Sequence, residues 1–265
     1  MNPDEKSATS PFDGTAAYYA QFRAPYPAEA LNYLVEAFHL DHGARVLDLG
    51  SGPGTIAIPL SRFVAEVVAI DPDAAMLEEG RRLAAAAGRS NIQWIGSGAE
   101  NISESIGKFR LATIGQAFHW MNRDLVLHRV SKIIEEGGGL ALINPGKRRP
   151  QESWQTVANQ VVAKFLGPRG RHPMMNSEPE HEPSLRRSEC FSVFSAREFS
   201  GEITRDVTSI IGCLYSTSGS ARHHFRDQVA EFEAELSEAL LSLNSFGVFK
   251  ERIETEVLVA PKKRS

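Results

Sequence analysis

The sequence predicts an α/β protein built on a doubly wound, mostly parallel sheet. Short apolar runs alternate with stretches of helical periodicity between residues 41 and 146, which is typical of repeated strand and helix units. The first apolar run ends abruptly in a glycine-rich turn, as the first strand of such sheets commonly does. Residues 250–260 alternate apolar and polar side chains and predict an antiparallel last strand. We therefore expect a seven-stranded sheet with a helical cap.

Each element follows from its local pattern. Aromatic and apolar side chains recur at helical spacing over residues 14–39, and Pro25 and Pro27 divide this stretch into two expected helices. Farther along, apolar runs predict strands at 46–49, 67–71, 91–96, 109–116, 140–143, 191–203 and 250–260. Helices are expected at 55–63, where Pro59 predicts a bend or a short helix, and at 75–88, 123–135 and from Thr204 onward.

Length and composition are those of an ordinary globular protein. The 265 residues are enough for one substantial core, and the net charge of −4 gives no general attraction to nucleic acid. No apolar run approaches the roughly 18 residues of a membrane span, and the polar N-terminus lacks the apolar core of a secretory signal. We expect a cytoplasmic protein that binds neither nucleic acid nor membrane, with its oligomeric state left open. The two cysteines, Cys190 and Cys213, lack metal-ligand spacing, so no metal site is expected.

The stretch from Arg45 to Thr55 reads R-V-L-D-L-G-S-G-P-G-T and is the centre of the functional prediction. Its alternating glycines let the backbone take positive φ and let a ligand approach the main chain closely. The dinucleotide fingerprint requires its third glycine at the position that Thr55 occupies. The spacing therefore weakens the interpretation as a pyrophosphate site, although an NAD-dependent oxidoreductase stays open as an alternative.

Two motifs resemble those of known methyltransferases. Asp48 followed by Gly50, Gly52 and Gly54 resembles the first motif of class I S-adenosylmethionine-dependent methyltransferases. Residues 19–27, Y-A-Q-F-R-A-P-Y-P, resemble a segment of small-molecule methyltransferases similar to trans-aconitate methyltransferase. This resemblance covers residues 19 to about 146. It implies a Rossmann-like fold, S-adenosyl-L-methionine as cofactor and a small-molecule acceptor.

The resemblance also implies which residues hold the cofactor. Asp48, Gly50 and Gly52 would form the turn beneath it. Tyr19 and Arg23 would lie over it, with the guanidinium facing the methionine carboxylate in a bidentate fork. Ala24 stands where the family often has proline, which affects the local bend more than this contact.

Asp71 ends the second expected strand, 21 residues after Gly50. An open parallel sheet places this position beside the first strand's tip, where a carboxylate can accept both ribose hydroxyls. The alternative interpretation is a solvated aspartate that caps the next helix. By resemblance, Met76 would pack on the adenine, and Ala99 with Glu100 would form the adenine loop, in which Gly98 replaces a frequent aspartate.

The loop after the fourth strand, from Gln116 to Trp120, is expected at the ligand-binding edge of the sheet. Gln116 at the strand tip is a candidate contact to the cofactor. His119 is the candidate general base, because its ordinary pKa lies near neutrality, or a residue that positions the acceptor. Together with Tyr18, His119 and Trp120 are expected to line the substrate pocket.

The chain is expected to divide into four segments. Residues 1–40 would form an N-terminal helical arm, 41–146 the cofactor-binding core, 147–190 a cap or lid insertion, and 191–265 the elements that complete sheet and cap. The Pro-, Gly- and charge-rich stretch at 167–183 is the candidate lid. The predicted function is methyl transfer to an O, N or C atom of a small molecule by in-line displacement. A relative that binds the cofactor without transferring a methyl group is a further alternative.

Overall fold

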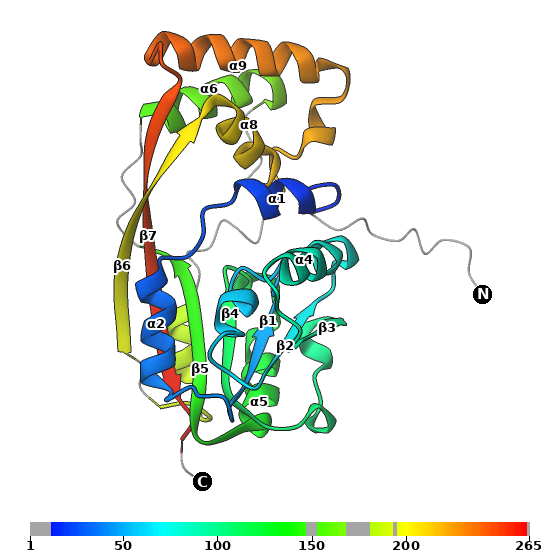
Figure 1. Ribbon diagram of the computed structural model, residues 1–265, viewed down its shortest axis with the longest axis vertical. Helices are drawn as coiled ribbons and strands as arrows, with labels where there is room; N and C mark the ends of the chain where they lie inside the picture. Colours follow the sequence, from blue (N-terminus) through cyan, green and yellow to red (C-terminus); the bar gives the residue numbers. More distant parts are fainter. Residues whose placement is uncertain (1–11, 147–152, 168–180, 193–194, 264–265) are drawn as a thin grey trace, which may run out of the picture.

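The computed structural model describes residues 12–146, 153–167, 181–192 and 195–263 (Figure 1). Most of the expected lid at 167–183 lies outside these residues. The strands of the described chain form one seven-stranded sheet in the order β3-β2-β1-β4-β5-β7-β6. β7 is antiparallel to β5 and to β6, whereas the other neighbouring strands are parallel. The predicted doubly wound sheet with an antiparallel last strand is therefore confirmed.

Strands and helices alternate through the first half of the chain. The strands are β1 (Arg45–Leu49), β2 (Glu66–Asp71), β3 (Ile92–Gly96), β4 (Phe109–Gly115), β5 (Ile134–Pro145), β6 (Ser195–Asp206) and β7 (Val248–Pro261). The α-helices are α1 (Ala16–Phe22), α2 (Ala28–Ala37), α3 (Ala57–Leu60), α4 (Ala74–Ala86), α5 (Arg123–Ile133), α6 (Ser153–Leu166), α7 (His181–Arg187), α8 (Val207–Tyr215) and α9 (Val229–Leu243). Short 3-10 helices include η1 (Ala99–Asn101), η2 (Glu104–Ile106), η3 (Phe118–Trp120) and η5 (Arg222–Gln228).

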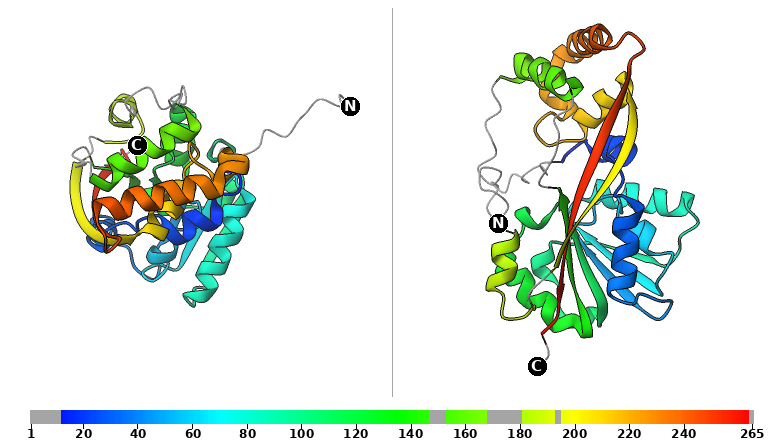
Figure 2. Two further views of the ribbon diagram at one scale, coloured as in Figure 1. Left: turned by 90° about the horizontal axis from the view of Figure 1, so that it is seen from above. Right: turned by 90° about the vertical axis from the view of Figure 1, so that its left-hand side faces the viewer.

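The central strands are apolar because both faces of the sheet are covered. One face packs against α2 and α3 through a cluster that includes Leu34, Val46 and Leu60. The opposite face packs against α5 and α7 through a cluster that includes Val126 and Leu185. The right-hand view of Figure 2 shows the sheet edge-on, with helices on both of its faces. This arrangement leaves the carboxyl ends of β1, β2 and β4 as the edge where a ligand can bind.

Two boundaries differ from the prediction. The helix expected over 123–135 ends at Ile133, and β5 starts at Ile134 rather than at residue 140. The glycines in between belong to the strand, because a Cβ on Gly139 would lie 2.6 Å from the backbone oxygen of Ala260. The helix expected from Thr204 starts at Val207, since Thr204 pairs with Lys250 within the sheet. The short helix expected at Pro59 is confirmed.

β6 and β7 form a long two-stranded ribbon that carries the cap away from the sheet (Figure 1). β5 pairs with β7 only from Thr255 to Pro261, whereas β6 pairs with β7 from Val248 to Val259. Residues 248–254 of β7 therefore extend beyond β5. α8, η5 and α9 follow the far end of β6, and α6 packs against α9. Their apolar side chains form a separate cluster centred on Tyr215, Phe225 and Phe232.

α1 lies between the cap and the sheet and contacts both α8 and α4 (Figure 1). α2, although part of the expected N-terminal arm, packs on the sheet. Within the described ranges, none of the helices combines the length and the apolar character needed to cross a membrane.

Candidate cofactor and acceptor site

The three glycines after β1 have different structural roles. All have positive φ, with 64° at Gly50, 53° at Gly52 and 83° at Gly54. A Cβ on Gly50 would lie 2.5 Å from the Cβ of Ala117, and one on Gly54 would lie 2.6 Å from the indole of Trp94. A Cβ on Gly52 would meet nothing within 4 Å. The outer glycines therefore allow close packing of the turn, while the middle one faces open space where a ligand can approach the main chain.

Asp71 fixes the shape of this turn. Its Oδ2 accepts a hydrogen bond of 2.8 Å from the backbone N–H of Gly52, and its Oδ1 accepts one of 2.9 Å from that of Asp73. Burial raises the pKa of the Asp71 carboxyl, and these two hydrogen bonds oppose the rise. The cap of α4 is made by Asp73, whose side chain accepts from Ala75 and Met76. The alternative role as a helix cap therefore belongs to Asp73 and not to Asp71.

Asp48 lies behind the turn and is 1% exposed. Its Oδ1 accepts a hydrogen bond of 2.8 Å from the Thr113 hydroxyl, whereas its Oδ2 has no partner at normal hydrogen-bond geometry among the described residues. Burial raises the pKa of Asp48 to about 7, and interactions with the Thr113 hydroxyl and, more weakly, the backbone N–H of Ala57 oppose the rise. The carboxylate is thus a buried group with unused acceptor capacity close to the turn.

Tyr19 and Arg23 come from α1 and from the residue that ends it. The Arg23 guanidinium lies over the Tyr19 ring, 5.0 Å from its centroid. Burial raises the pKa of the Tyr19 hydroxyl, Arg23 lowers it, and the charges of Asp71 and Asp48 raise it further. These effects place Tyr19, Arg23, Asp48 and Asp71 in one region of the structure, and their roles toward a cofactor stay predictions.

Of the two arginines at this site, Arg23 and Arg205, Arg23 makes fewer polar contacts with the described residues. Its terminal nitrogen donates a hydrogen bond of 3.5 Å to the backbone oxygen of Ser216. Its Nε is buried without a hydrogen-bond partner, and no carboxylate forms an ion pair with it among the described residues. The neighbouring Arg205, in contrast, is paired with Glu251. Arg23 therefore offers a guanidinium to an anionic partner.

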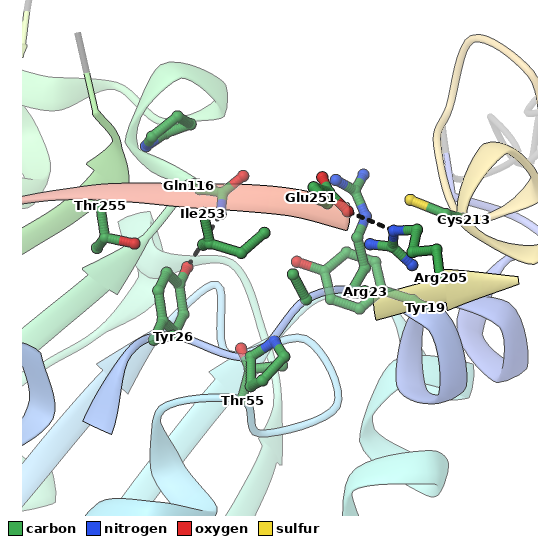
Figure 3. A pocket seen from close by; sticks show the side chains of 13 residues that line it. Tyr19, Arg23, Tyr26, Thr55, Gln116, Arg205, Cys213, Glu251, Ile253 and Thr255 are labelled. Atoms are coloured by element: carbon green, nitrogen blue, oxygen red, sulfur yellow. Dashed lines mark hydrogen bonds and ion pairs between the residues drawn. The ribbon is translucent and has the colours of Figure 1, made fainter. Parts of the chain in front are cut away.

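A pocket of about 80 Å³ opens beside these residues, between the sheet and the cap (Figure 3). α1 and the linker to α2 form one wall, and the β6–β7 ribbon forms the opposite wall. The lining residues are Tyr19, Arg23, Ala24, Pro25, Tyr26, Thr55, Gln116, Pro145, Arg205, Cys213, Glu251, Ile253 and Thr255.

Gln116 occupies a strained position at the floor of the pocket. Its φ of 51° is unusual for a residue other than glycine, and strain of this kind is typical of functional sites. Its side-chain amide donates a hydrogen bond of 3.4 Å to the Tyr26 hydroxyl. A Cβ on Gly115 would lie 2.7 Å from the same hydroxyl, so the glycine makes room for Tyr26. Gln116 is therefore held toward the pocket, as Figure 3 shows.

The residues expected around the adenine are more buried. Met76 is 3% exposed in the first turn of α4, and Ala99 is 4% exposed in η1. Glu100 has a structural contact, because its Oε1 accepts a hydrogen bond of 2.8 Å from the backbone N–H of Asn122. Their roles toward adenine stay predictions.

The three residues expected to form the substrate pocket do not meet in the described pocket. Tyr18 packs into the cap cluster, with its ring 5.3 Å from that of Tyr215. His119 and Trp120 lie together in η3, with ring centroids 5.0 Å apart, and Phe12 packs edge-on against Trp120 at 6.0 Å. Burial lowers the pKa of His119, and the positive charge of Arg123 lowers it further. None of the three lines the pocket of Figure 3.

Several pocket residues were missed by sequence reasoning. Tyr26 lies within the Y-A-Q-F-R-A-P-Y-P segment, whose resemblance could have drawn attention to it. Arg205, Glu251 and Thr255 come from the two ribbon strands. In the sequence they are only polar residues within a pattern of alternating polar and apolar side chains. No local signal marks them, because their neighbours in the pocket lie far away in the sequence.

Comparisons with known proteins find methyltransferases by sequence and by fold. Residues 46–138 match the family model of a methyltransferase domain. An uncharacterized methyltransferase from Mycobacterium tuberculosis is 29% identical over 164 residues, which cover 62% of this chain and 63% of the relative. The chain thus matches less than two thirds of that relative's length.

Two solved structures have the same fold. A putative type II methyltransferase from Anaeromyxobacter dehalogenans superposes with a TM-score of 0.62 at 20% identity, covering 91% of this chain and 98% of the other. A methyltransferase from Thiobacillus denitrificans, solved with S-adenosyl-L-homocysteine, gives a TM-score of 0.54 at 20% identity, covering 95% and 98% of the two chains. Residues 46–138 are therefore similar in sequence to a methyltransferase domain, and the chain has the same fold as these two structures.

Proposed function

We propose that this protein transfers the methyl group of S-adenosylmethionine to an O, N or C atom of a small-molecule acceptor. The observation that carries the proposal is the convergence of an open glycine turn, two buried carboxylates and an unpaired guanidinium at one edge of the sheet. The cofactor has matching parts, namely a sugar with two hydroxyls, an ammonium group and a carboxylate.

The residues present fit these parts. Asp71 retains lone pairs beyond the two hydrogen bonds it accepts, and a carboxylate can accept from both hydroxyls of a ribose. Asp48 lies behind the turn with its Oδ2 lacking a normal hydrogen bond from the described residues, and an ammonium group bound nearby would favour the charged form of this carboxyl. Arg23 suits the carboxylate of the amino-acid end, because a guanidinium and a carboxylate form paired hydrogen bonds.

The chemistry then requires mainly positioning. When bound, S-adenosylmethionine supplies an electrophilic methyl group: the acceptor's lone pair forms the new bond to carbon while the S–C electron pair stays on sulfur. The protein has to hold the acceptor in line with that bond and exclude water. Such positioning contributes on the order of 7 to 11 kcal/mol, whereas a general base typically adds about a hundred- to ten-thousand-fold in rate.

His119 is the candidate to take the proton that an O–H or N–H acceptor releases. Its lowered pKa keeps the imidazole neutral at pH 7, which is the form that accepts a proton. Its position outside the described pocket favours a supporting role over an essential one. We therefore place the main catalytic contribution in the walls of the pocket.

The acceptor is proposed to be small because the pocket is small and walled by both sheet and cap. Its volume of about 80 Å³ lies well below the roughly 300 to 1,000 Å³ of typical ligand pockets. Such a space can hold only the reacting part of an acceptor, and this supports the proposal of a compact metabolite.

The experiment that tests the proposal follows a labelled methyl group. The purified protein is incubated with methyl-labelled S-adenosylmethionine and a small-molecule extract of the host, and label in new products is measured. Transfer by the unaltered protein that is absent with Asp71→Asn would support the proposal. Cofactor binding without any transfer would favour a binding protein that has lost catalysis.

A further inference from the structure

α1 packs against α8 of the cap as well as against α4 of the cofactor-binding core. The Phe22 ring lies directly on Gly212 of α8, where any Cβ would collide with it. The Tyr18 ring meets the edge of Tyr215 in the cap cluster. The position of α1, and with it the position of Tyr19 and Arg23, is therefore set in part by contacts with the cap.

Arg205 forms the joint between the ribbon and the end of α1. It is the second-last residue of β6 and is only 3% exposed. Its Nε donates to Oε2 of Glu251 on β7, and its terminal nitrogen donates a hydrogen bond of 2.9 Å to the backbone oxygen of Phe22. Figure 3 shows this ion pair directly beside Arg23. One buried side chain thus ties both ribbon strands to the last residue of α1.

Arg23 follows Phe22 immediately, at the point where the chain leaves the helix. Its backbone is extended, with φ of −68° and ψ of 138°. The helix has only seven residues, and besides Arg205 the exit is held by the hydrogen bond from the Arg23 backbone N–H to the Tyr19 backbone oxygen and by the Phe22 ring on Gly212. A displacement of the Phe22 carbonyl would carry the peptide bond of Arg23 with it, and so would move the guanidinium.

We propose that Arg205 is a positioning residue for cofactor binding: held by Glu251, it fixes the end of α1 so that Arg23 faces the amino-acid end of the cofactor. The inference rests on the proposed function. It assigns to the ribbon a task in ligand binding that goes beyond carrying the cap. It also explains why a buried ion pair, a weak source of net stability, is placed at this junction.

The test compares two ligands that differ only at the amino-acid end. S-adenosylhomocysteine carries this end, whereas 5′-methylthioadenosine has the same nucleoside and thioether without it. The variant is the double substitution Arg205→Met and Glu251→Gln, which removes both charges and avoids a buried unpaired carboxylate. The affinity of each ligand is measured by titration calorimetry on the full chain.

A matched control exists at the amino ends of β1 and β2. Arg45 pairs with Glu66 at 2.6 Å and donates to the backbone oxygens of Ile106 and Lys108, so it makes a comparable but more exposed joint far from the site. Arg45→Met with Glu66→Gln should leave the affinity for both ligands unchanged. Any loss of binding in this control would report general loosening of the fold.

We expect the Arg205 and Glu251 variant to bind S-adenosylhomocysteine at least tenfold more weakly and 5′-methylthioadenosine less than twofold more weakly. Arg23→Gln should give the same selective loss, and adding it to the double variant should cause little further loss, since both changes remove one contact. An equal loss for both ligands, or no loss for S-adenosylhomocysteine, would overturn the inference alone. Failure of the unaltered protein to bind S-adenosylhomocysteine would overturn the proposed function as well.

Discussion

The cap and the cofactor cradle, meaning Gly50–Gly54 with Asp48 and Asp71, are held together by opposite kinds of interaction. The cap cluster is apolar and well packed, with Phe225 and Phe232 stacked at 4.0 Å. The cradle contains buried carboxylates, three positive φ angles and a buried oxygen without a normal hydrogen bond among the described residues. The comparison teaches that apolar packing stabilises the cap, while the cradle holds unfavourable groups in place for a ligand.

The largest effect on stability is expected from a substitution that disrupts the packing of the cap. Phe232→Ala removes a ring that is fully buried and packed against Phe225 and Phe165, and should lower the free energy of unfolding by about 3 to 5 kcal/mol. Denaturant unfolding followed by circular dichroism measures this change. Leu243→Ala, at an apolar residue that is 44% exposed, is the control and should cost well under about 1.5 kcal/mol. Equal effects of the two substitutions would contradict the division of roles.

The next effect is a pH dependence that originates in the cradle. Burial raises the pKa of Asp48 from 3.8 to about 7, so the folded state holds this proton more tightly than the unfolded state does. The contribution of Asp48 to stability therefore falls as pH rises from about 4 to 7, by up to about 1.4 kcal/mol per pH unit, and is constant above that range.

Asp48→Asn removes this dependence. Relative to the unaltered protein, the variant should gain stability steadily between about pH 4 and pH 7 and keep a constant advantage above it. Urea unfolding at several pH values measures the difference between the two proteins. A difference that does not vary with pH would show that the carboxylate is not perturbed in the folded state.

Asp71→Asn should act on both ligand binding and stability, because the carboxylate also accepts hydrogen bonds from the backbone N–H groups of Gly52 and Asp73. Loss of one charge-assisted hydrogen bond to the proposed ribose, worth about 1.5 to 3 kcal/mol, should lower the affinity for S-adenosylhomocysteine about ten- to a hundredfold. Calorimetric titration gives this value, and the thermal midpoint is recorded in parallel. Unchanged affinity in the variant would show that Asp71 does not hold the ribose of the ligand.

The smallest effect is expected for His119→Ala. Because this residue lies outside the described pocket, we expect measurable turnover and a loss of less than tenfold in kcat, below the range of about a hundredfold or more for an essential base. The labelled-methyl assay measures the rate at saturating cofactor. A variant that binds cofactor normally but is completely inactive would assign His119 an essential role.

The cradle could be predicted from the sequence because its parts are close together in the chain. Strand, turn and Asp71 span fewer than 30 residues, and the spacing of the glycines is a local pattern. The joint of Arg205 with Phe22 and Glu251 could not be predicted in this way, since its members are 183 and 46 residues apart. The start of β5 was also hidden, because glycines that normally end helices serve there to admit a neighbouring backbone.

The most direct test of the central claim is a calorimetric titration of the unaltered protein with S-adenosylhomocysteine and, separately, with NADH. The account predicts saturable binding of S-adenosylhomocysteine and none of NADH, because the third glycine comes one position too early for the dinucleotide fingerprint and the buried Asp48 carboxyl suits an ammonium group better than a diphosphate. Binding of NADH without binding of S-adenosylhomocysteine would contradict it.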